Sequence, residues 1–283
     1  MAGKFARSLE LVKASANVLG QERKLLVFPL LSGICCLLVA ASFAAPVFLS
    51  VHANQAAGPH AQLGSGFYIG LFTFYLVQYS VIFFFNTALV GAAMMHMNGE
   101  RPTLRDGIGL AVSKLPQIFG YALIAATVGM LLRALQERMG LLGRIVVGMI
   151  GMAWSVATFL VVPILAATDQ GPIEAVRHSS GMLKRTWGEN LIGNAGIHVV
   201  FMLGYMLLAA VIAVLFAATS AMHSLVLMAL LGALAVVAVI VMALVQSALQ
   251  GIYAAALYRY AEYGDAGDGF QSGMLEQAFR LKT

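Results

Sequence analysis

The sequence predicts an all-α integral membrane protein with six transmembrane helices, built as three repeats of an amphipathic surface helix plus a transmembrane hairpin. First, 60% of the 283 residues are hydrophobic and 10% are charged, whereas a soluble domain carries about 25% charged residues. Second, residues 25–99 and 190–258 contain no Asp, Glu, Lys or Arg, and each run far exceeds the ~20 residues that cross a bilayer. Third, a charged, helix-patterned stretch precedes each pair of apolar segments.

Six apolar segments are long enough to cross a bilayer. Their approximate bounds are Leu25–Ser50, Phe67–Met97, Pro116–Leu132, Ile145–Thr168, Leu191–Ala218 and Ser224–Tyr258. The third is the shortest, near the lower limit of about 17 residues, so the hairpin of the third and fourth spans could instead be partly re-entrant. The sixth is too long for one crossing. We expect its last turns, around Tyr253, Tyr258 and Tyr260, to run into the interface, where tyrosine is favoured.

The domain organisation follows from these spans. We expect a single membrane domain over residues 1–263, with repeat units at approximately 4–100, 101–170 and 171–263. Residues 264–283 are expected to form a cytoplasmic amphipathic tail, because its apolar residues recur on one helical face. Those residues are Phe270, Met274, Ala278 and Leu281.

The basic residues are unevenly distributed about the spans. With the N-terminus in the cytoplasm, 14 of the 17 Lys and Arg residues lie inside, and only Arg133, Arg138 and Arg144 lie outside. The positive-inside rule therefore predicts that both termini are cytoplasmic.

Internal similarity predicts the repeats. The stretch from Leu9 matches the stretch from Ile173 at five positions: Glu10 with Glu174, Val12 with Val176, Lys13 with Arg177, Ser15 with Ser179, and Leu19 with Leu183. A weaker third copy has Pro102 and Lys114 spaced like Pro172 and Lys184. Thr103 followed by Asp106 is an N-cap signature for this copy. We expect three helices that lie near the membrane plane on the same side.

These amphipathic helices place basic side chains near the head groups of anionic lipids. The alternative is that they are ordinary cytoplasmic loops packed on the bundle. The residues that we expect to contact lipid head groups are Lys13, Arg23, Lys24, Arg105, Arg177, Lys184 and Arg185.

One intramembrane polar set is the candidate site within the spans. It comprises Asn86, Asn194, His198, Gln246 and Gln250, which lie at similar depths on the second, fifth and sixth spans. Uncompensated amides and imidazoles are unfavourable in lipid, so these side chains are expected to turn inward. They could line a polar cavity, or they could simply form hydrogen bonds between helices. We expect His198 to face the bundle interior and to bond Asn86, Gln246 or Gln250.

The sequence lacks the patterns of several chemistries. No acidic or basic residue lies in the middle of a confidently assigned span, and there is no Gly-rich phosphate loop, HExxH helix or CxxC motif. Cys35 and Cys36 are adjacent, and neighbouring cysteines rarely pair, so no disulfide framework is expected. We therefore expect no catalytic residues, no cofactor and no metal, and a protein that is not an enzyme.

Two sequence motifs carry a resemblance. The motifs SxELVKxS with LLxFPLLSG, within Ser8–Gly33, and ALYRYA, Ala256–Ala261, resemble an uncharacterised family of bacterial multi-pass membrane proteins. The repeat of surface helix and hairpin is more loosely similar to the membrane domain of some glycerophosphodiester phosphodiesterases, although no catalytic domain of that type is present. The resemblance implies a location in the bacterial inner membrane and assigns no functional residue.

The favoured function is that of a non-enzymatic inner-membrane protein that organises lipids or partner proteins. The alternative is a channel or transporter for a lipid or a small neutral solute. The expected partners are the phospholipid bilayer, anionic lipid, and a second copy of the chain or another protein, with no nucleic acid. Rows of small residues, such as Ala209, Ala213 and Ala217, permit close helix contacts within or between subunits.

Overall fold

The computed structural model describes residues 2–56, 65–186, 190–221 and 224–265, and every regular element in these ranges is a helix. The helices are α1 (Ala2–Gln21), the 3₁₀ helix η1 (Arg23–Leu26), α2 (Val27–Ala56), α3 (Ser65–Met97), α4 (Leu104–Ser113), α5 (Leu115–Arg138), α6 (Leu141–Ala157), α7 (Val161–Ala167), α8 (Pro172–Thr186), α9 (Asn190–Ala221) and α10 (Leu225–Tyr263). The predicted tail over 264–283 lies almost entirely outside the described residues.

Six helical segments in the described part of the chain are long and apolar enough to cross a membrane, the number that the sequence predicted, and they fit a multi-pass membrane protein. They are Arg23–Leu49, Gly66–Met97, Leu115–Arg138, Leu141–Ala167, Ile197–Thr219 and Leu225–Tyr263. The third is longer than the sequence suggested, because the helix continues through Arg133 to Arg138. Its 24 residues extend about 36 Å at ~1.5 Å per residue, enough for a full crossing.

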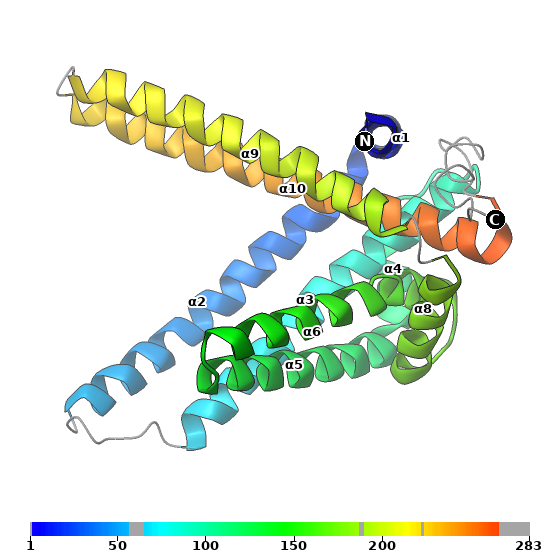
Figure 1. Ribbon diagram of the computed structural model, residues 1–283, viewed down its shortest axis with the longest axis horizontal. Coiled ribbons are helices and arrows are strands. Elements are labelled where there is room, and N and C mark those ends of the chain that lie inside the picture. Colours follow the sequence, from blue (N-terminus) through cyan, green and yellow to red (C-terminus); the bar gives the residue numbers. More distant parts are fainter. Residues whose placement is uncertain (1, 57–64, 187–189, 222–223, 266–283) are drawn as a thin grey trace.

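The long helices form three hairpins that extend from a common end of the molecule (Figure 1). Their tips lie at one end, whereas α1, α4, α7 and α8 gather at the other, which we call the short-helix end. The hairpin of α9 and α10 diverges from α2 and from the pair α5 and α6. The element order, a short helix followed by two spans, occurs three times, while the equivalence of the three units stays a prediction.

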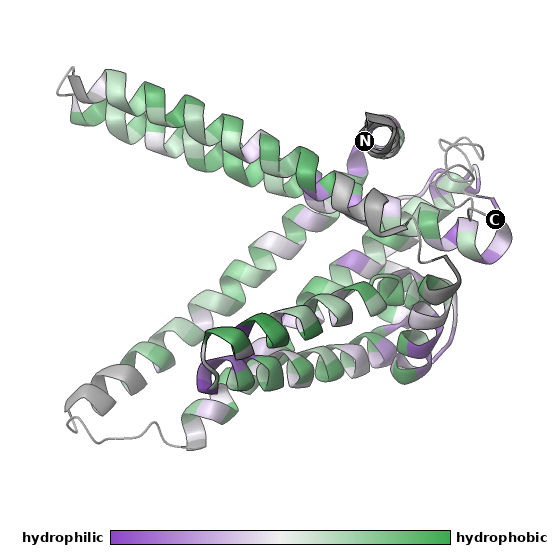
Figure 2. Ribbon diagram, viewed as in Figure 1, coloured by the Kyte–Doolittle hydropathy of each residue, from purple (hydrophilic) through white to green (hydrophobic). Residues whose placement is uncertain are grey.

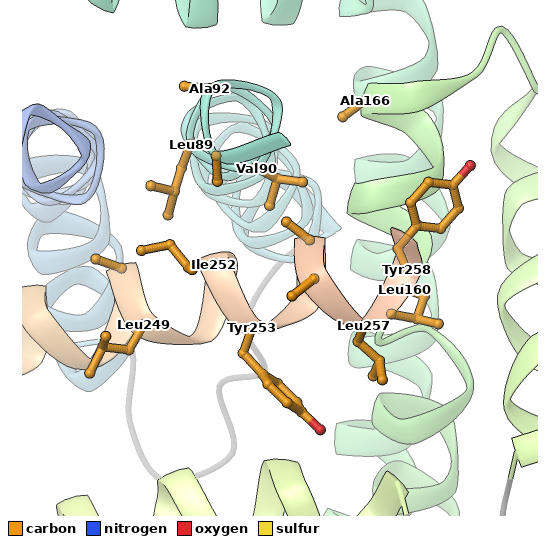
Figure 3. Packing of buried hydrophobic residues seen from close by; sticks show 14 of the residues in the cluster. Leu89, Val90, Ala92, Leu160, Ala166, Leu249, Ile252, Tyr253, Leu257 and Tyr258 are labelled. Carbon is orange, nitrogen blue, oxygen red and sulfur yellow. The ribbon is translucent and has the colours of Figure 1, made fainter. Parts of the chain in front are cut away.

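The buried core lies at the short-helix end. Figure 3 shows Leu89 and Val90 of α3 beside Ile252 of α10, and Tyr258 projecting toward the helix that carries Ala166. In contrast, the hairpins expose large apolar side chains along most of their length, and green predominates on them in Figure 2. Polar residues concentrate near the short-helix end, with a second group at the turn between α5 and α6 (Figure 2). The exposed apolar surface is the part that lipid would cover.

The last turns of α10 differ from the expectation. Tyr253 and Tyr258 were expected at a lipid interface, but each is 1% exposed and belongs to the protein core. The reason is that α1, α3 and α7 pack against α10, so the rings contact protein.

The fourth span contains a break between two helices. It is divided into α6 and α7 at Thr158–Leu160. Pro163 explains the break, because proline has no N–H to donate to the carbonyl of Phe159 and its ring clashes with that carbonyl. Ser179 of α8 bonds two backbone groups at the break: its Oγ donates to the Ala157 carbonyl at 2.7 Å and accepts from the Leu160 N–H at 3.2 Å.

The predicted N-cap of α4 is confirmed. The Asp106 N–H donates to Thr103 Oγ1, and the Thr103 N–H donates to Asp106 Oδ2 at 2.8 Å, forming a capping box. These bonds from Thr103 lower the pKa of Asp106. The cap fixes the start of a helix that packs closely on α3. A Cβ at Gly107 would lie 2.7 Å from the Phe28 ring and 2.8 Å from the Ala88 carbonyl oxygen, so no larger residue fits there.

Candidate functional site

The structure brings together one pair from the predicted intramembrane set. His198 of α9 and Gln250 of α10 lie with their Nε2 atoms 3.5 Å apart, at the outer limit for a hydrogen bond. However, the His198 side chain is exposed, so the expectation that it faces the bundle interior is wrong. Ile197 and Phe201 form the buried face of this part of α9, and His198 lies on a different face.

The remaining members of the set are not gathered into one cluster. Asn86 and Gln246 are partly exposed, and no hydrogen bond joins either to another described side chain. The side chain of Asn194 lies outside the described part of the structure. These residues instead lie where the exposed part of a span meets the buried core. Asn86 immediately precedes the buried run from Thr87, and Gln246 and Gln250 flank Ala248, where the burial of α10 begins.

The predicted head-group residues lie on the outward faces of their helices. Lys13, Arg23, Lys24, Arg105 and Arg177 are all exposed. The side chains of Lys184 and Arg185 lie outside the described part of the structure. Five basic groups therefore stand at the short-helix end, on α1, η1, α4 and α8.

The opposite faces of α1 and α8 are buried at matched positions. On α1, Ser15, Val18 and Leu19 are at most 7% exposed. On α8, the matched residues Ser179, Met182 and Leu183 are at most 8% exposed. Both helices therefore present an apolar face to the core and a basic face outward, which is the geometry of helices that lie on a membrane surface.

Sequence reasoning missed an open cavity of about 460 Å³ at the short-helix end. Its walls come from the end of α3, from α4, from the end of α7 and from the last turns of α10. The lining residues are Gly91, Met94, Met95, Asn98, Leu110, Ala166, Ala167, Tyr258, Arg259 and Tyr263. A volume of this size is typical of small-molecule sites.

Arg259 supplies the cavity's charge. Its Nη1 donates to Asn98 Oδ1, whereas its Nε is buried and has no hydrogen-bond partner among the described atoms. A buried donor without a partner costs about 1–3 kcal/mol. None of the described lining residues is acidic. The described lining therefore carries a positive charge and no negative one, which favours an anion.

The backbone holds Asn98 in place. Gly99 has a φ of 83°, a left-handed conformation that glycine adopts without strain. It closes the end of α3, where the Asn98 N–H donates to the Met94 carbonyl and the Glu100 N–H to the Met95 carbonyl. This turn brings Asn98 to Arg259, 161 positions later in the chain.

Contacts beside the cavity join the elements that surround it. His178 Nε2 of α8 lies 3.4 Å from Glu262 Oε2 of α10. Lys114, which is 8% exposed, donates from Nζ to the Thr168 carbonyl at 2.7 Å and pairs with Asp169. The hydrogen bond and charge of Lys114 lower the pKa of Asp169. Lys114 is thus committed to protein partners, which leaves Arg259 as the described cation that faces the cavity.

A second open hollow, of about 530 Å³, lies beside the first at the same end. It is lined by Gln21, Glu22, Lys24, His96, Gly99, Glu100 and Arg101. Gln21 Oε1 lies 3.2 Å from His96 Nε2, which joins α1 to α3. Acidic and basic groups are mixed here, so this hollow shows no preference for one sign of charge.

One sequence signal did point toward the cavity. The motif ALYRYA contains Tyr258 and Arg259, although it was noted only as a family mark. No spacing rule could link it to Asn98, because the two come together only when α10 packs on α3.

The comparisons with known proteins concern the family alone. A model of DUF6159, a family of unknown function, matches residues 65–270. The matched range contains ALYRYA and the whole cavity, whereas the motif within Ser8–Gly33 lies outside it. Comparisons with curated proteins and with solved structures gave no match, and the looser similarity to phosphodiesterase membrane domains stays a prediction. Because the match covers more than half of the 283 residues, the chain belongs to DUF6159, a family of unknown function.

Proposed function

We propose that this protein is a non-enzymatic organiser of anionic lipids in the bacterial inner membrane, with its short-helix end and both termini in the cytoplasm. The observation that supports it best is the set of five exposed basic residues: Lys13, Arg23, Lys24, Arg105 and Arg177. They lie on short helices whose opposite faces are buried, so the basic groups are held outward at one end of the molecule.

The physical basis is electrostatic. Each Lys or Arg near an anionic membrane surface contributes about 1 kcal/mol of attraction. Five such groups on rigid helices would enrich acidic lipids around the protein. The opposite end carries fewer basic residues, among them Arg138 and Arg144 at the turn between α5 and α6, so the enrichment should be confined to one leaflet.

Lipid selectivity tests the proposal. The full chain is reconstituted in phosphatidylcholine bilayers, and the preference for spin-labelled phosphatidylglycerol over spin-labelled phosphatidylcholine is measured by electron paramagnetic resonance. We expect a preference in the wild type that falls severalfold when all five residues become Gln. The matched control, Arg138→Gln with Arg144→Gln, removes exposed charge from the opposite end and should retain most of the preference. No preference in the wild type, or equal loss in the control, would overturn the proposal.

Orientation has a separate test. Cysteines are placed singly at Ser113 in α4 and at Gly140 between α5 and α6, in a variant in which Cys35 and Cys36 are replaced by Ser. A membrane-impermeant thiol reagent added to intact cells should label position 140 and spare position 113. Labelling at 113 from outside would reverse the proposed topology.

A further inference from the structure

We propose that the cavity beside Arg259 binds a phosphate ester, supplied by the head group of one anionic phospholipid. The choice of a lipid source rests on the proposed function, whereas the phosphate site itself rests on the cavity. The site is distinct from the five exposed basic residues, which attract lipid collectively and without a pocket.

The donors in the cavity suit a phosphate group. Arg259 lines the cavity, where its Nη2 can donate to a ligand. Its Nε, on the same planar fork, has no partner but is buried, so it joins the contact only when the side chain shifts. A guanidinium fork of this kind matches the spacing of two phosphate oxygens. Asn98 accepts from Arg259 through Oδ1, which leaves its amide nitrogen as a further donor at the same place.

The rest of the lining suits the neighbouring atoms of a lipid. Met94, Met95 and Leu110 supply apolar surface beside the charged group. Met side chains adapt their shape to irregular ligands. Tyr258 and Tyr263, with ring centroids 6.4 Å apart, form a polar-tipped aromatic wall. A ligand with a phosphate at one end and glycerol or acyl carbon at the other fits such a lining better than a bare inorganic ion.

The position of the cavity agrees with this ligand. It is lined by the ends of three apolar spans, on α3, α7 and α10, and by the surface helix α4. These ends lie beyond the exposed apolar surface and at the same end as the five basic residues. In the proposed orientation the cavity is at or just below the head groups of the cytoplasmic leaflet.

Binding is measured on the purified full chain in a neutral detergent by isothermal titration calorimetry with three probes. These are dioctanoyl phosphatidylglycerol, which carries phosphate and acyl chains, glycerol 3-phosphate, which lacks the chains, and dioctanoylglycerol, which lacks the phosphate. We expect one equivalent of the phospholipid to bind at least tenfold more tightly than either of the other two.

Two variants test the cavity. Arg259→Gln removes the guanidinium group and should weaken phospholipid binding at least tenfold. Because this change also removes the contact with Asn98, Ala167→Trp provides a second test: Ala167 is exposed at the cavity, so the indole would fill the space while Arg259 stays in place. The matched control is Arg138→Gln, an exposed arginine at the turn between α5 and α6 that lies outside the set of five and should leave the titration unchanged.

Each outcome of these titrations either supports or overturns part of the proposal. Equal binding of dioctanoylglycerol would show that phosphate is not recognised, and would overturn the site. Equal binding of glycerol 3-phosphate would keep the phosphate site and overturn its lipid source. Unaltered binding in Ala167→Trp, or loss in the Arg138 control, would place the ligand elsewhere. A saturable site that persists when bilayer selectivity is absent would refute the proposed function and leave this inference standing.

Discussion

At the scale of single residues, Ser15 and Ser179 show what sequence similarity can and cannot establish. The sequence pairs them, and the structure buries both completely. Yet Ser179 bonds two backbone groups at the break before α7, whereas Ser15 Oγ is buried with no partner. The equivalence of the two positions could be predicted from the sequence because burial follows helical periodicity. The hydrogen bonds of Ser179 could not be predicted, because they depend on a break in a different helix.

The two serines therefore predict opposite effects of the same substitution. Ser179→Ala leaves the Leu160 N–H and the Ala157 carbonyl without their partner and should destabilise the protein by about 1–3 kcal/mol. Ser15→Ala removes a hydroxyl that has no bond to lose, so it should be neutral or slightly stabilising. Thermal unfolding in detergent, followed by circular dichroism, measures both. Equal losses in the two variants would contradict the bonding seen here.

The ion pair of Lys114 and Asp169 gives a prediction for pH. Lys114 lowers the pKa of Asp169 below its ordinary value of 3.8, so the pair contributes stability above that value. This contribution is lost as the pH falls through the lowered pKa. Asp169 is almost fully exposed, so the effect should be small. In Asp169→Asn, the decline of the unfolding temperature between about pH 4 and pH 2 should be shallower than in the wild type. A parallel decline in the two proteins would contradict the pair.

At the scale of elements, the sequence predicted the existence of each helix well and its continuity less well. The six spans and the three short helices follow from apolar runs and from periodicity, which are local properties. The break between α6 and α7 also has a local cause in Pro163, but its stability depends on Ser179 of another helix. The cavity was beyond prediction, because its walls come from three separate regions of the chain, residues 91–110, 166–167 and 258–263.

Two glycines of α4 test how closely this helix packs on α3. A Cβ at Gly107 would meet the backbone oxygen of Ala88 at 2.8 Å, whereas a Cβ at Gly109 would meet nothing within 4 Å. Gly107→Ala should therefore cost about 1–3 kcal/mol through overpacking. Gly109→Ala should stabilise the protein by roughly 0.5–1 kcal/mol, because alanine favours the helix. Unfolding in the same detergent compares them, and a tolerated Gly107→Ala would mean that α4 does not contact the α3 backbone.

At the scale of the whole molecule, the spans are longer than the bilayer that they cross. The 39 residues of α10 extend about 58 Å at ~1.5 Å per residue, against a hydrocarbon thickness of about 30 Å. A tilt of roughly 60° would be needed to immerse all of it, beyond the range of about 0–40° seen for such helices. The surplus ends instead converge with α1, α4, α7 and α8 into a protein core. The hydropathy of the sequence could not reveal this, because an apolar residue has the same hydropathy whether lipid or protein covers it.

This division predicts the depth of each part of α10. The exposed apolar residues, such as Val237 at 55%, should lie in hydrocarbon, whereas Tyr263, at 67% exposed, should lie in water or among head groups. Single tryptophans are placed at these two positions in a protein whose two native tryptophans are replaced by Phe, and fluorescence is measured in bilayers with bromines at the middle of the acyl chains.

Quenching by bromine requires near contact. Position 237 should therefore lose much of its emission, and position 263 should lose little. A Trp at Leu234, which is 64% exposed on the same helix, is a matched control and should behave like position 237. If the label at position 263 were quenched as strongly as the label at position 237, α10 would lie within the hydrocarbon to its end. The buried turns from Ala248 to Tyr258 would then form an intramembrane core, and the cavity beside Arg259 would lie too deep to receive a lipid head group.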